Sequence, residues 1–220
     1  MKYPVNFEIE FKRHNYPGKF IVLEGVDASG KTVHATKLVK ELEKQGHKAI
    51  YTKEPTDGLI GKLIRQVLNR EIKVSPTTLQ YLFSADRAEH QREILNKLKD
   101  GYIVVCDRYY WSAVAFGMAD IGGELDFFLT AYSILSLYNE FIAPDMTFLL
   151  DVDPEVAVER ISQSHKHTEI YDRKDIVVKT RETYHRLVAK FEQEFDVIDA
   201  NRSIEEVSSE LLNKVKNLLK

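Results

Sequence analysis

The chain has 220 residues, of which 44% are hydrophobic and 30% charged. This composition excludes a disordered tail, a collagen-like rod and a disulfide-stapled miniprotein, and the length predicts one domain or one domain with small insertions. The formal net charge of −3, from 31 basic and 34 acidic residues, argues against a general nucleic-acid-binding protein.

Cysteine content and hydropathy predict the compartment. Cys106 is the single cysteine, so no disulfide can form within the chain, which is typical of a reducing environment. No apolar run approaches the roughly 20 residues of a membrane helix, and residues 1–18 lack the apolar region of a signal peptide. We therefore expect a cytoplasmic protein that does not enter a membrane.

The N-terminal residues 1–18 are expected to form an extension of the domain. Residues 6–12 alternate apolar and charged side chains, which favours an additional edge strand, with a loosely ordered leader as the alternative. The remaining residues, 19–220, contain no linker-like segment and are expected to form one domain.

Strand-like and helix-like segments alternate from residue 20 to the C-terminus. The expected strands cover residues 20–24, 48–53, 102–106, 146–152 and 197–199. The expected helices cover 32–45, 59–68, 75 to about 101, 125–141, a segment beginning at 153–154, 172–195, and a last helix opened by the capping box of Ser203 and Glu206. The strands are apolar throughout, which is typical of a parallel sheet covered on both faces. We therefore expect an α/β fold of three layers, with five parallel strands between helices.

A phosphate-binding motif follows the first strand. The pattern G-x-x-x-x-G-K-[ST] is met by consecutive residues between a strand and a helix: Gly25, Val26, Asp27, Ala28, Ser29, Gly30, Lys31 and Thr32. In such a loop the backbone N–H groups and the following helix N-terminus surround phosphates, the lysine reaches the β and γ phosphates, and the hydroxyl binds Mg²⁺. The alternative is a glycine-containing turn that binds nothing, but the full pattern in this context favours a nucleoside triphosphate.

The residues after the third strand indicate the reaction type. Asp107 and Arg108 stand where an ATPase usually has Asp-Glu, whose second acid prepares a water molecule for attack. An arginine instead suits an acceptor that is itself a phosphate, because a guanidinium neutralises and orients an oxyanion. The alternative is a structural ion pair of Arg108 with a carboxylate.

Two further segments could form an acceptor pocket. Phe83 and Arg87 are four residues apart and share a helix face, so a ring could stack on a base while a guanidinium binds its edge or a phosphate. Residues 110–117 combine aromatic and small side chains that could wall a flat ligand. Core packing is the alternative for both segments.

Taken together, these residues resemble the thymidylate kinase family of nucleoside-monophosphate kinases. The resemblance covers residues 19 to about 205, with matching segments in the family's order at residues 24–32, 53–55, 82–87, 107–116, 144–145, 149–152 and 198–200. It implies a P-loop kinase fold with a short lid at about 160–172. It also implies transfer of the γ-phosphoryl group of ATP to dTMP, giving dTDP and ADP for dTTP synthesis.

The resemblance further implies the roles of residues around the base and sugar of dTMP. Phe83 would stack on thymine, Leu68 would line the same pocket, and Arg87 would bind the base edge. Ser112 would border the base, and Phe116 would lie under the sugar and leave no room for a ribose 2′-hydroxyl.

Other roles follow from the same resemblance. Asp27 would contact the 3′-hydroxyl of the acceptor, Arg108 would hold its phosphate, and Tyr171 at the end of the lid would reach it as well. The turn at residues 199–202, including Arg202, would flank adenine. The peptide bond at residues 54–55 corresponds to a position where the family often has a cis bond.

The resemblance leaves one cation of the phosphate clamp to be identified. One branch of the family has an arginine within the phosphate loop, where this chain has Ala28 and Ser29; the other branch supplies arginines from the lid. Besides Lys31, we therefore expect Arg160 to approach the transferred group, with Lys166 as the second candidate, from a lid that is mobile without ligands.

The implied cofactor is Mg²⁺, held through Thr32 and a water-bridged Asp107, with ATP as co-substrate. A homodimer is implied through helices that flank the sheet, the helix carrying Phe83 or the segment 125–141. Two other functions remain open at this point: a kinase for another deoxynucleotide or deoxynucleoside, and a nucleotide-binding module without turnover, because the lid contains few cations.

Overall fold

The computed structural model describes residues 8–120, 134–135, 141–163 and 169–220. Within them, five parallel strands form one sheet in the order β2-β3-β1-β4-β5. The strands are β1 (Lys19–Glu24), β2 (Ala49–Lys53), β3 (Ile103–Asp107), β4 (Met146–Asp151) and β5 (Asp196–Asp199). The helices are α1 (Lys31–Lys44), α2 (Leu59–Leu68), α3 (Pro76–Lys99), α4 (Tyr110–Asp120), α6 (Pro154–Gln163), α7 (Lys174–Lys190), the short 3-10 helix η1 (Glu192–Glu194) and α8 (Ile204–Leu218). The predicted three-layer fold and its five parallel strands are confirmed.

Local capping residues begin two of the helices. The Ser75 side chain accepts a hydrogen bond from the backbone N–H of Thr78 at the start of α3. At the start of α8, the Ser203 side chain and the Glu206 side chain each bond to the other's backbone N–H, which forms the predicted capping box. These contacts satisfy N–H groups that have no partner within the helix.

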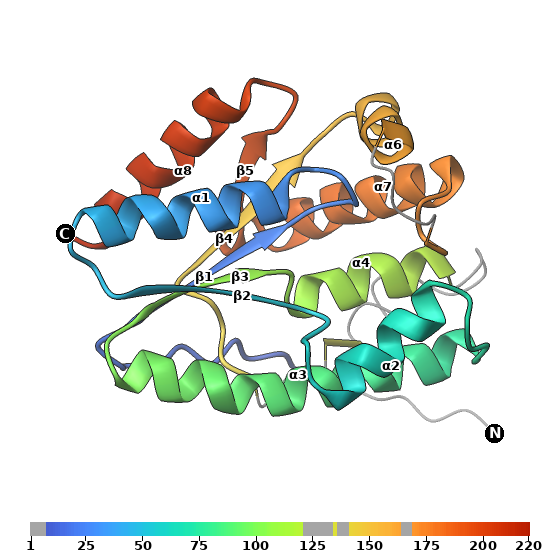
Figure 1. Ribbon diagram of the computed structural model, residues 1–220, viewed down its shortest axis with the longest axis horizontal. Coiled ribbons are helices and arrows are strands. Elements are labelled where there is room, and N and C mark those ends of the chain that lie inside the picture. The colour runs from blue at the N-terminus through green and yellow to red at the C-terminus, as the bar shows by residue number, and fades with distance from the viewer. Residues whose placement is uncertain (1–7, 121–133, 136–140, 164–168) are drawn as a thin grey trace.

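The alternation of side chains along each strand produces two separate cores. In β1, Phe20 and Val22 face a cluster formed with α2, α3, α4 and α7, whereas Ile21 and Leu23 face a cluster formed with α1 and α8. Figure 1 shows α1 and α8 on one side of the sheet and α2, α3 and α4 on the other. All four side chains are fully buried, which explains why the strand is apolar throughout.

The register of the strands brings the phosphate loop and the Asp107–Arg108 dipeptide together. Leu23 of β1 is opposite Asp107 of β3, and Lys53 of β2 is opposite the same residue. Because the strands are parallel, the loops that follow β1, β2 and β3 leave the sheet at one edge.

The expected edge strand in the N-terminal extension is not found among residues 8–18. Lys12 makes one isolated parallel bridge with Ile142, outside the named strands. The apolar side chains pack on the helical layer instead: the Phe11 ring lies 6.0 Å from Tyr110, 5.5 Å from Trp111 and 5.9 Å from Phe191. Packing on helices buries the apolar side of the alternating pattern without a ladder of hydrogen bonds, so the pattern alone does not require a strand.

Two charged side chains also fix this segment. The Arg13 guanidinium donates to both carboxylate oxygens of Glu194, at 2.7 and 2.8 Å, and to the backbone oxygen of Pro144. His14 Nε2 lies 2.9 Å from the carboxylate of Asp145, which also accepts the backbone N–H of Phe20 at 2.7 Å. The extension is therefore tied to the beginning of β1 and to the segment before β4.

Several expectations lie outside the described residues. These are most of the expected helix at 125–141 and the middle of the lid, residues 164–168, which includes Lys166. In the part of the chain that the structure describes, no helix combines the length and the apolar character needed to cross a membrane.

Candidate active site

A cavity of about 600 Å³ is lined by the phosphate loop, α2, α3, α4, α6 and the turn before α8. It brings together most of the residues predicted from the sequence. They are Asp27, Ala28, Gly30, Lys31, Thr32, Leu68, Phe83, Arg87, Asp107, Arg108, Ser112, Phe116, Arg160, Tyr171 and Arg202. Three predicted residues, Gly25, Val26 and Ser29, do not line the cavity but form the loop behind it.

The backbone of the phosphate loop requires its first glycine. Gly25 has a φ of 143°, and a Cβ atom there would lie 2.7 Å from the backbone oxygen of Leu150 in β4. A side chain would therefore be strained by its conformation and would collide with the neighbouring strand. The absence of a side chain at Gly25 therefore allows the loop to lie directly against the end of β4.

Lys31 is held by the loop that it belongs to. Its Nζ donates to the backbone oxygen of Val26 at 2.7 Å and to the Ser29 hydroxyl at 3.3 Å. Burial and, after it, the nearby Arg108 guanidinium lower the pKa of Lys31 to about 8. Carboxylates of Asp107, Asp27 and Glu24 act in the opposite direction but do not compensate.

Thr32 and Asp107 place two oxygen donors at the mouth of the loop. The Thr32 hydroxyl donates a hydrogen bond to the Asp107 carboxylate, which joins the first turn of α1 to the end of β3. Mg²⁺ prefers such oxygen ligands and usually takes few of them from the protein, with phosphates and water completing its shell. Among the described residues no cluster of three or more His, Cys, Asp or Glu side chains could hold a metal. The Thr32 and Asp107 oxygens are donors of the type that Mg²⁺ prefers.

Arg108 connects the phosphate loop to α4. It adopts a left-handed backbone conformation with a φ of 73°. Its guanidinium donates to the Gly25 backbone oxygen at 3.0 Å, to the Ser112 hydroxyl at 3.1 Å and to the Asp27 carboxylate. It also lies over the Phe116 ring, 4.8 Å from the centroid. Arg108 does form an ion pair with a carboxylate, which was the alternative to a phosphate-binding role. That carboxylate, Asp27, belongs to the phosphate loop, and both residues line the cavity.

Glu24 is a buried carboxylate behind the cavity. It accepts hydrogen bonds from the backbone N–H groups of Tyr109 at 3.0 Å and Ser112 at 3.2 Å, and from the Tyr184 hydroxyl at 2.8 Å. The Ser112 hydroxyl donates to it as well. The pKa of Glu24 is raised, because the effect of burial exceeds that of the hydrogen bonds and of Arg108, which lower it. The sequence analysis assigns no role to Glu24, although an acid at the end of an apolar strand is a usable signal.

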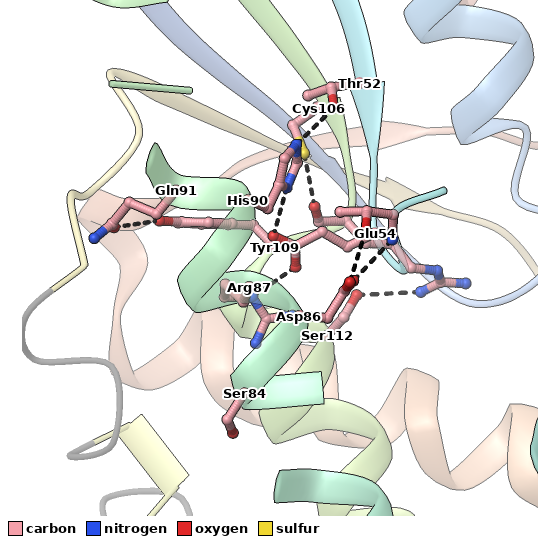
Figure 2. Close-up of polar contacts among 12 residues, drawn as sticks. Thr52, Glu54, Ser84, Asp86, Arg87, His90, Gln91, Cys106, Tyr109 and Ser112 are labelled. Carbon is pink, nitrogen blue, oxygen red and sulfur yellow. Dashed lines mark hydrogen bonds and ion pairs between the residues drawn. The ribbon is translucent and has the colours of Figure 1, made fainter. Parts of the chain in front are cut away.

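Arg87 is oriented by a buried chain of polar contacts, shown in Figure 2. Its Nε donates to Glu54 Oε2 at 2.6 Å, and Glu54 Oε1 lies 3.0 Å from His90 Nδ1. His90 Nε2 in turn lies 2.6 Å from the Thr52 hydroxyl. The guanidinium also faces the Tyr109 ring at 5.6 Å. Arg87 and Glu54 are almost completely buried, so this chain fixes the guanidinium from behind the cavity.

The predicted base pocket has both apolar and aromatic walls. Phe83 lines the cavity and also packs against the core, so the two interpretations of this ring are compatible. Phe116 and Tyr171 meet edge to face, with ring centroids 5.0 Å apart. The backbone N–H of Ile170 donates to the Leu68 oxygen at 3.1 Å, so the described end of the lid rests on α2. The peptide bond between Glu54 and Pro55 is cis, as expected.

Arg160 lies between the phosphate loop and the turn after β5. Its guanidinium donates to the backbone oxygen of Ala28 at 3.4 Å and to that of Ala200 at 3.2 Å. Arg202 in the same turn donates to the Asp199 backbone oxygen at 3.0 Å and to the Glu210 carboxylate. Two arginines from separate elements therefore flank the loop side of the cavity.

Several residues that line the cavity were not predicted from the sequence, among them His34 and Gln80. Burial, with Lys37 and Arg160 adding to it, lowers the pKa of His34 to about 4, so its ring is neutral at pH 7. His34 Nδ1 lies 2.9 Å from the Ser208 hydroxyl, which links α1 to α8. Neither residue belongs to a short motif, because each reaches the cavity only through the packing of its helix.

Comparisons with known proteins identify one family. The family model described as thymidylate kinase matches residues 23–211. The chain is 38% identical over 200 residues to a probable thymidylate kinase of Methanocaldococcus jannaschii, covering 90% of this chain and 96% of that protein. It is 36% identical to a probable thymidylate kinase of Pyrococcus horikoshii, covering 92% and 98%. The solved structure of thymidylate kinase from Candida albicans matches with a TM-score of 0.77 and 25% identity, covering 93% of each chain.

The lowered pKa of Lys31 predicts a pH-dependent affinity for ATP. Phosphates bind the protonated ammonium, and in the free protein its pKa is about 8. As the pH rises through this value, more of the free protein carries neutral Lys31 and binding must take up a proton, so the ATP affinity falls by up to about tenfold per pH unit. Calorimetric titrations at pH 8.5 in buffers of different ionisation enthalpy should show this proton uptake.

The matched variant is Lys31→Arg. It keeps the positive charge, but its guanidinium does not lose a proton in the pH range of the experiment. Its ATP affinity should be independent of pH between about 7.5 and 9.5, because guanidinium stays protonated throughout. Equal pH slopes for the two proteins would contradict the assignment.

Proposed function

The chain belongs to the thymidylate kinase family, and on this premise we propose how its own residues transfer a phosphoryl group from ATP to dTMP. The chain catalyses this ATP-dependent phosphorylation of dTMP. The observation that carries the proposed roles is the proximity of Lys31 and Arg108 beside the cavity, where the guanidinium contributes to the lowered pKa of the ammonium. One cation belongs to a phosphate loop and the other faces it, as transfer between two phosphate groups requires.

On the donor side, the phosphate loop and two arginines would bind ATP. Backbone N–H groups of residues 25–32 surround the β and γ phosphates, and Lys31 leaves its contacts with Val26 and Ser29 to pair with them. Arg202 and the turn at 199–202 flank the adenine end. Arg160 is already beside Ala28, so its fork can pair with phosphate oxygens without crossing the cavity.

On the acceptor side, Arg108 would hold the phosphate of dTMP. The Asp27 carboxylate is paired with the Arg108 guanidinium. From this position the carboxylate can accept a hydrogen bond from the 3′-hydroxyl of the sugar. The Phe116 ring lies under the same guanidinium and would fill the space of a ribose 2′-hydroxyl. Ser112 lines the cavity, but its hydroxyl is bonded to Glu24 and Arg108, so we assign it mainly to the positioning of Arg108.

The base would lie at the other end of the cavity. Phe83 would stack on the pyrimidine, and the guanidinium of Arg87, oriented by Glu54, would face a carbonyl oxygen at its edge. Leu68 and Tyr171 supply the remaining apolar walls. The contact between Phe116 and Tyr171 joins the sugar part of this pocket to the end of the lid.

Mg²⁺ would be held through Thr32 and Asp107, whose oxygens meet at the mouth of the loop. When bound, it would neutralise the β and γ phosphates of ATP. A phosphate oxygen of dTMP attacks the γ-phosphorus, the bond to the bridging oxygen breaks, and ADP leaves. Lys31, Arg108 and Arg160 neutralise charge along this path, and Asp27 orients the acceptor. Positioning and charge neutralisation account for most of the acceleration in such transfers.

Arg108→Ala should reduce kcat/KM for dTMP by about 10²–10³-fold, because it removes a charged, forked contact to the acceptor phosphate. The KM for ATP should change little. Steady-state assays that measure ADP release, with each substrate varied in turn, provide the measurement. Arg108→Lys should recover part of the loss, since it restores the charge without the fork. Loss of ATP affinity with retention of dTMP affinity would place Arg108 on the donor side.

Arg160→Ala should reduce kcat by roughly 10²-fold while the KM for dTMP changes far less. The physical reason is that a guanidinium aimed at the transferred group stabilises charge during transfer and does not touch the acceptor base or sugar. Arg173→Ala is the matched control, because this exposed arginine pairs with Asp175 at the start of α7. A wild-type kcat for Arg160→Ala would contradict this role. Arg108, Lys31 and Mg²⁺ would then suffice to neutralise the transferred phosphoryl group.

We also propose that the chain works as a homodimer in the cytoplasm, without a nucleic-acid or membrane partner. The family resemblance supports the dimer, and the single, buried and unpaired Cys106 supports a reducing compartment. The helix α3, which carries the base-pocket residues, is our candidate for the interface and exposes 62% of Tyr81.

Light scattering after size exclusion should give twice the 25.4 kDa mass of the chain. Tyr81→Lys should shift the mass towards the monomer, because it buries a charge in the proposed contact. Val197→Lys on β5 is the matched control, because its side chain is also exposed, it does not line the cavity, and β5 is an edge strand of the sheet. A wild-type chain that elutes as a monomer at all concentrations would refute the dimer.

A further inference from the structure

The buried side-chain amide of Gln80 has no role in the mechanism above. Neither its Oε1 nor its Nε2 has a hydrogen-bond partner among the described residues, although both atoms are covered from solvent. Buried polar groups are nearly always paired, because an unpaired donor or acceptor forfeits its bonds to water. Gln80 also lines the cavity. A ligand that supplies both partners would explain why an amide occupies this position.

The place of Gln80 on α3 relates it to the base pocket. Gln80, Phe83 and Arg87 are spaced by three and four residues, so they follow one face of the helix, and all three line the cavity. Phe83 offers a ring for stacking and Arg87 a guanidinium for the edge of the base. Gln80 supplies the mixed donor and acceptor on the same face.

A glycine on α4 makes room for this amide. A Cβ atom on Gly117 would lie 3.0 Å from Gln80 Nε2 and 3.1 Å from the Ile134 side chain. The Gln80 amide therefore packs closely against the backbone of α4 at Gly117, the residue after Phe116. The amide is enclosed between the two helices that wall the pocket, which limits where it can turn for a partner.

We propose that Gln80 reads the base of the acceptor nucleotide, an inference that rests on the acceptor site proposed above. The amide turns into the cavity as the base enters, so that Oε1 accepts the N3–H of a pyrimidine-2,4-dione and Nε2 donates to a neighbouring carbonyl oxygen. Carboxamides pair with base edges through this arrangement of one donor and one acceptor. The unpaired amide destabilises the free protein, and only a base with a matching acceptor and donor removes this effect. The contact therefore favours a pyrimidine-2,4-dione over bases with another edge.

Gln80 and Arg87 together would distinguish a dione from a cytosine-type edge. An amide alone can rotate and pair with either edge, because it carries a donor and an acceptor. Arg87 can only donate, and Glu54 fixes its orientation. A carbonyl at ring position 4 satisfies Arg87 and leaves N3–H for Gln80, whereas an amino group there would face the guanidinium with a second donor.

Gln80→Met tests the proposal, since methionine has a similar length and volume but no comparable hydrogen bonds. The acceptors compared are dTMP and 5-methyl-dCMP, which differ only at positions 3 and 4 of the ring. We expect kcat/KM for dTMP to fall by about 10- to 100-fold, mainly through KM. The preference for dTMP over 5-methyl-dCMP should narrow, and the KM for ATP should stay unchanged.

Thermal unfolding separates base reading from a structural role. Without ligands the variant should unfold at the wild-type Tm or above it, because it removes an unpaired buried amide. The rise in Tm on adding dTMP should shrink, whereas the rise on adding ATP should not. A lower Tm without ligands, together with an unchanged preference between the two acceptors, would overturn the inference.

Two further variants show which proposal fails if the result is negative. Gln66→Met, on the exposed face of α2, controls for the substitution itself and should behave as wild type. Phe83→Ala tests the acceptor pocket. If Phe83→Ala weakens dTMP binding but Gln80→Met retains wild-type affinity and preference, the Gln80 inference alone is wrong. If Phe83→Ala also binds dTMP as wild type does, the pocket is misplaced.

Discussion

A single buried carboxylate connects the parts from which the active site is built. Glu24 ends β1, yet its hydrogen bonds reach the first turn of α4 and the Tyr184 hydroxyl on α7. The turn that it holds contains Arg108, whose left-handed backbone carries a conformational cost that tertiary contacts must offset. The position of the Arg108 guanidinium, for which we propose a role on the acceptor side, thus depends on a group that does not line the cavity.

The cavity concentrates positive charge, and carboxylates hold that charge in place. Arg108 is paired with Asp27 and Arg87 with Glu54. Within the described part of the chain, the Lys31 ammonium donates to two neutral oxygens, those of Val26 and Ser29. Burial and, after it, the Arg108 guanidinium lower the pKa of the lysine. Negatively charged phosphate groups would offset the repulsion between Lys31 and Arg108, so the charges of the free protein favour such ligands.

Most of the fold was predictable because it depends on local patterns. Apolar runs indicated the strands, and capping residues such as Ser75 and Ser203 indicated helix starts to within a residue. The N-terminal extension shows the limit of such patterns. Its alternation of apolar and charged side chains was real, but the apolar side of Phe11 packs on helices and not beside a strand. Alternation specifies which side is buried, not what buries it.

The sequence by itself determined which chemistry to expect, because the phosphate loop and the Asp107–Arg108 dipeptide are short contiguous motifs whose residue types predict phosphate binding. Only the tertiary structure decided which distant residues complete the site. Glu24 acts through α4 and α7, and Gln80 borders the cavity beside Gly117 of another helix. Motifs are encoded by neighbours along the chain, whereas burial and the loss of hydrogen-bond partners arise only when separate elements pack together.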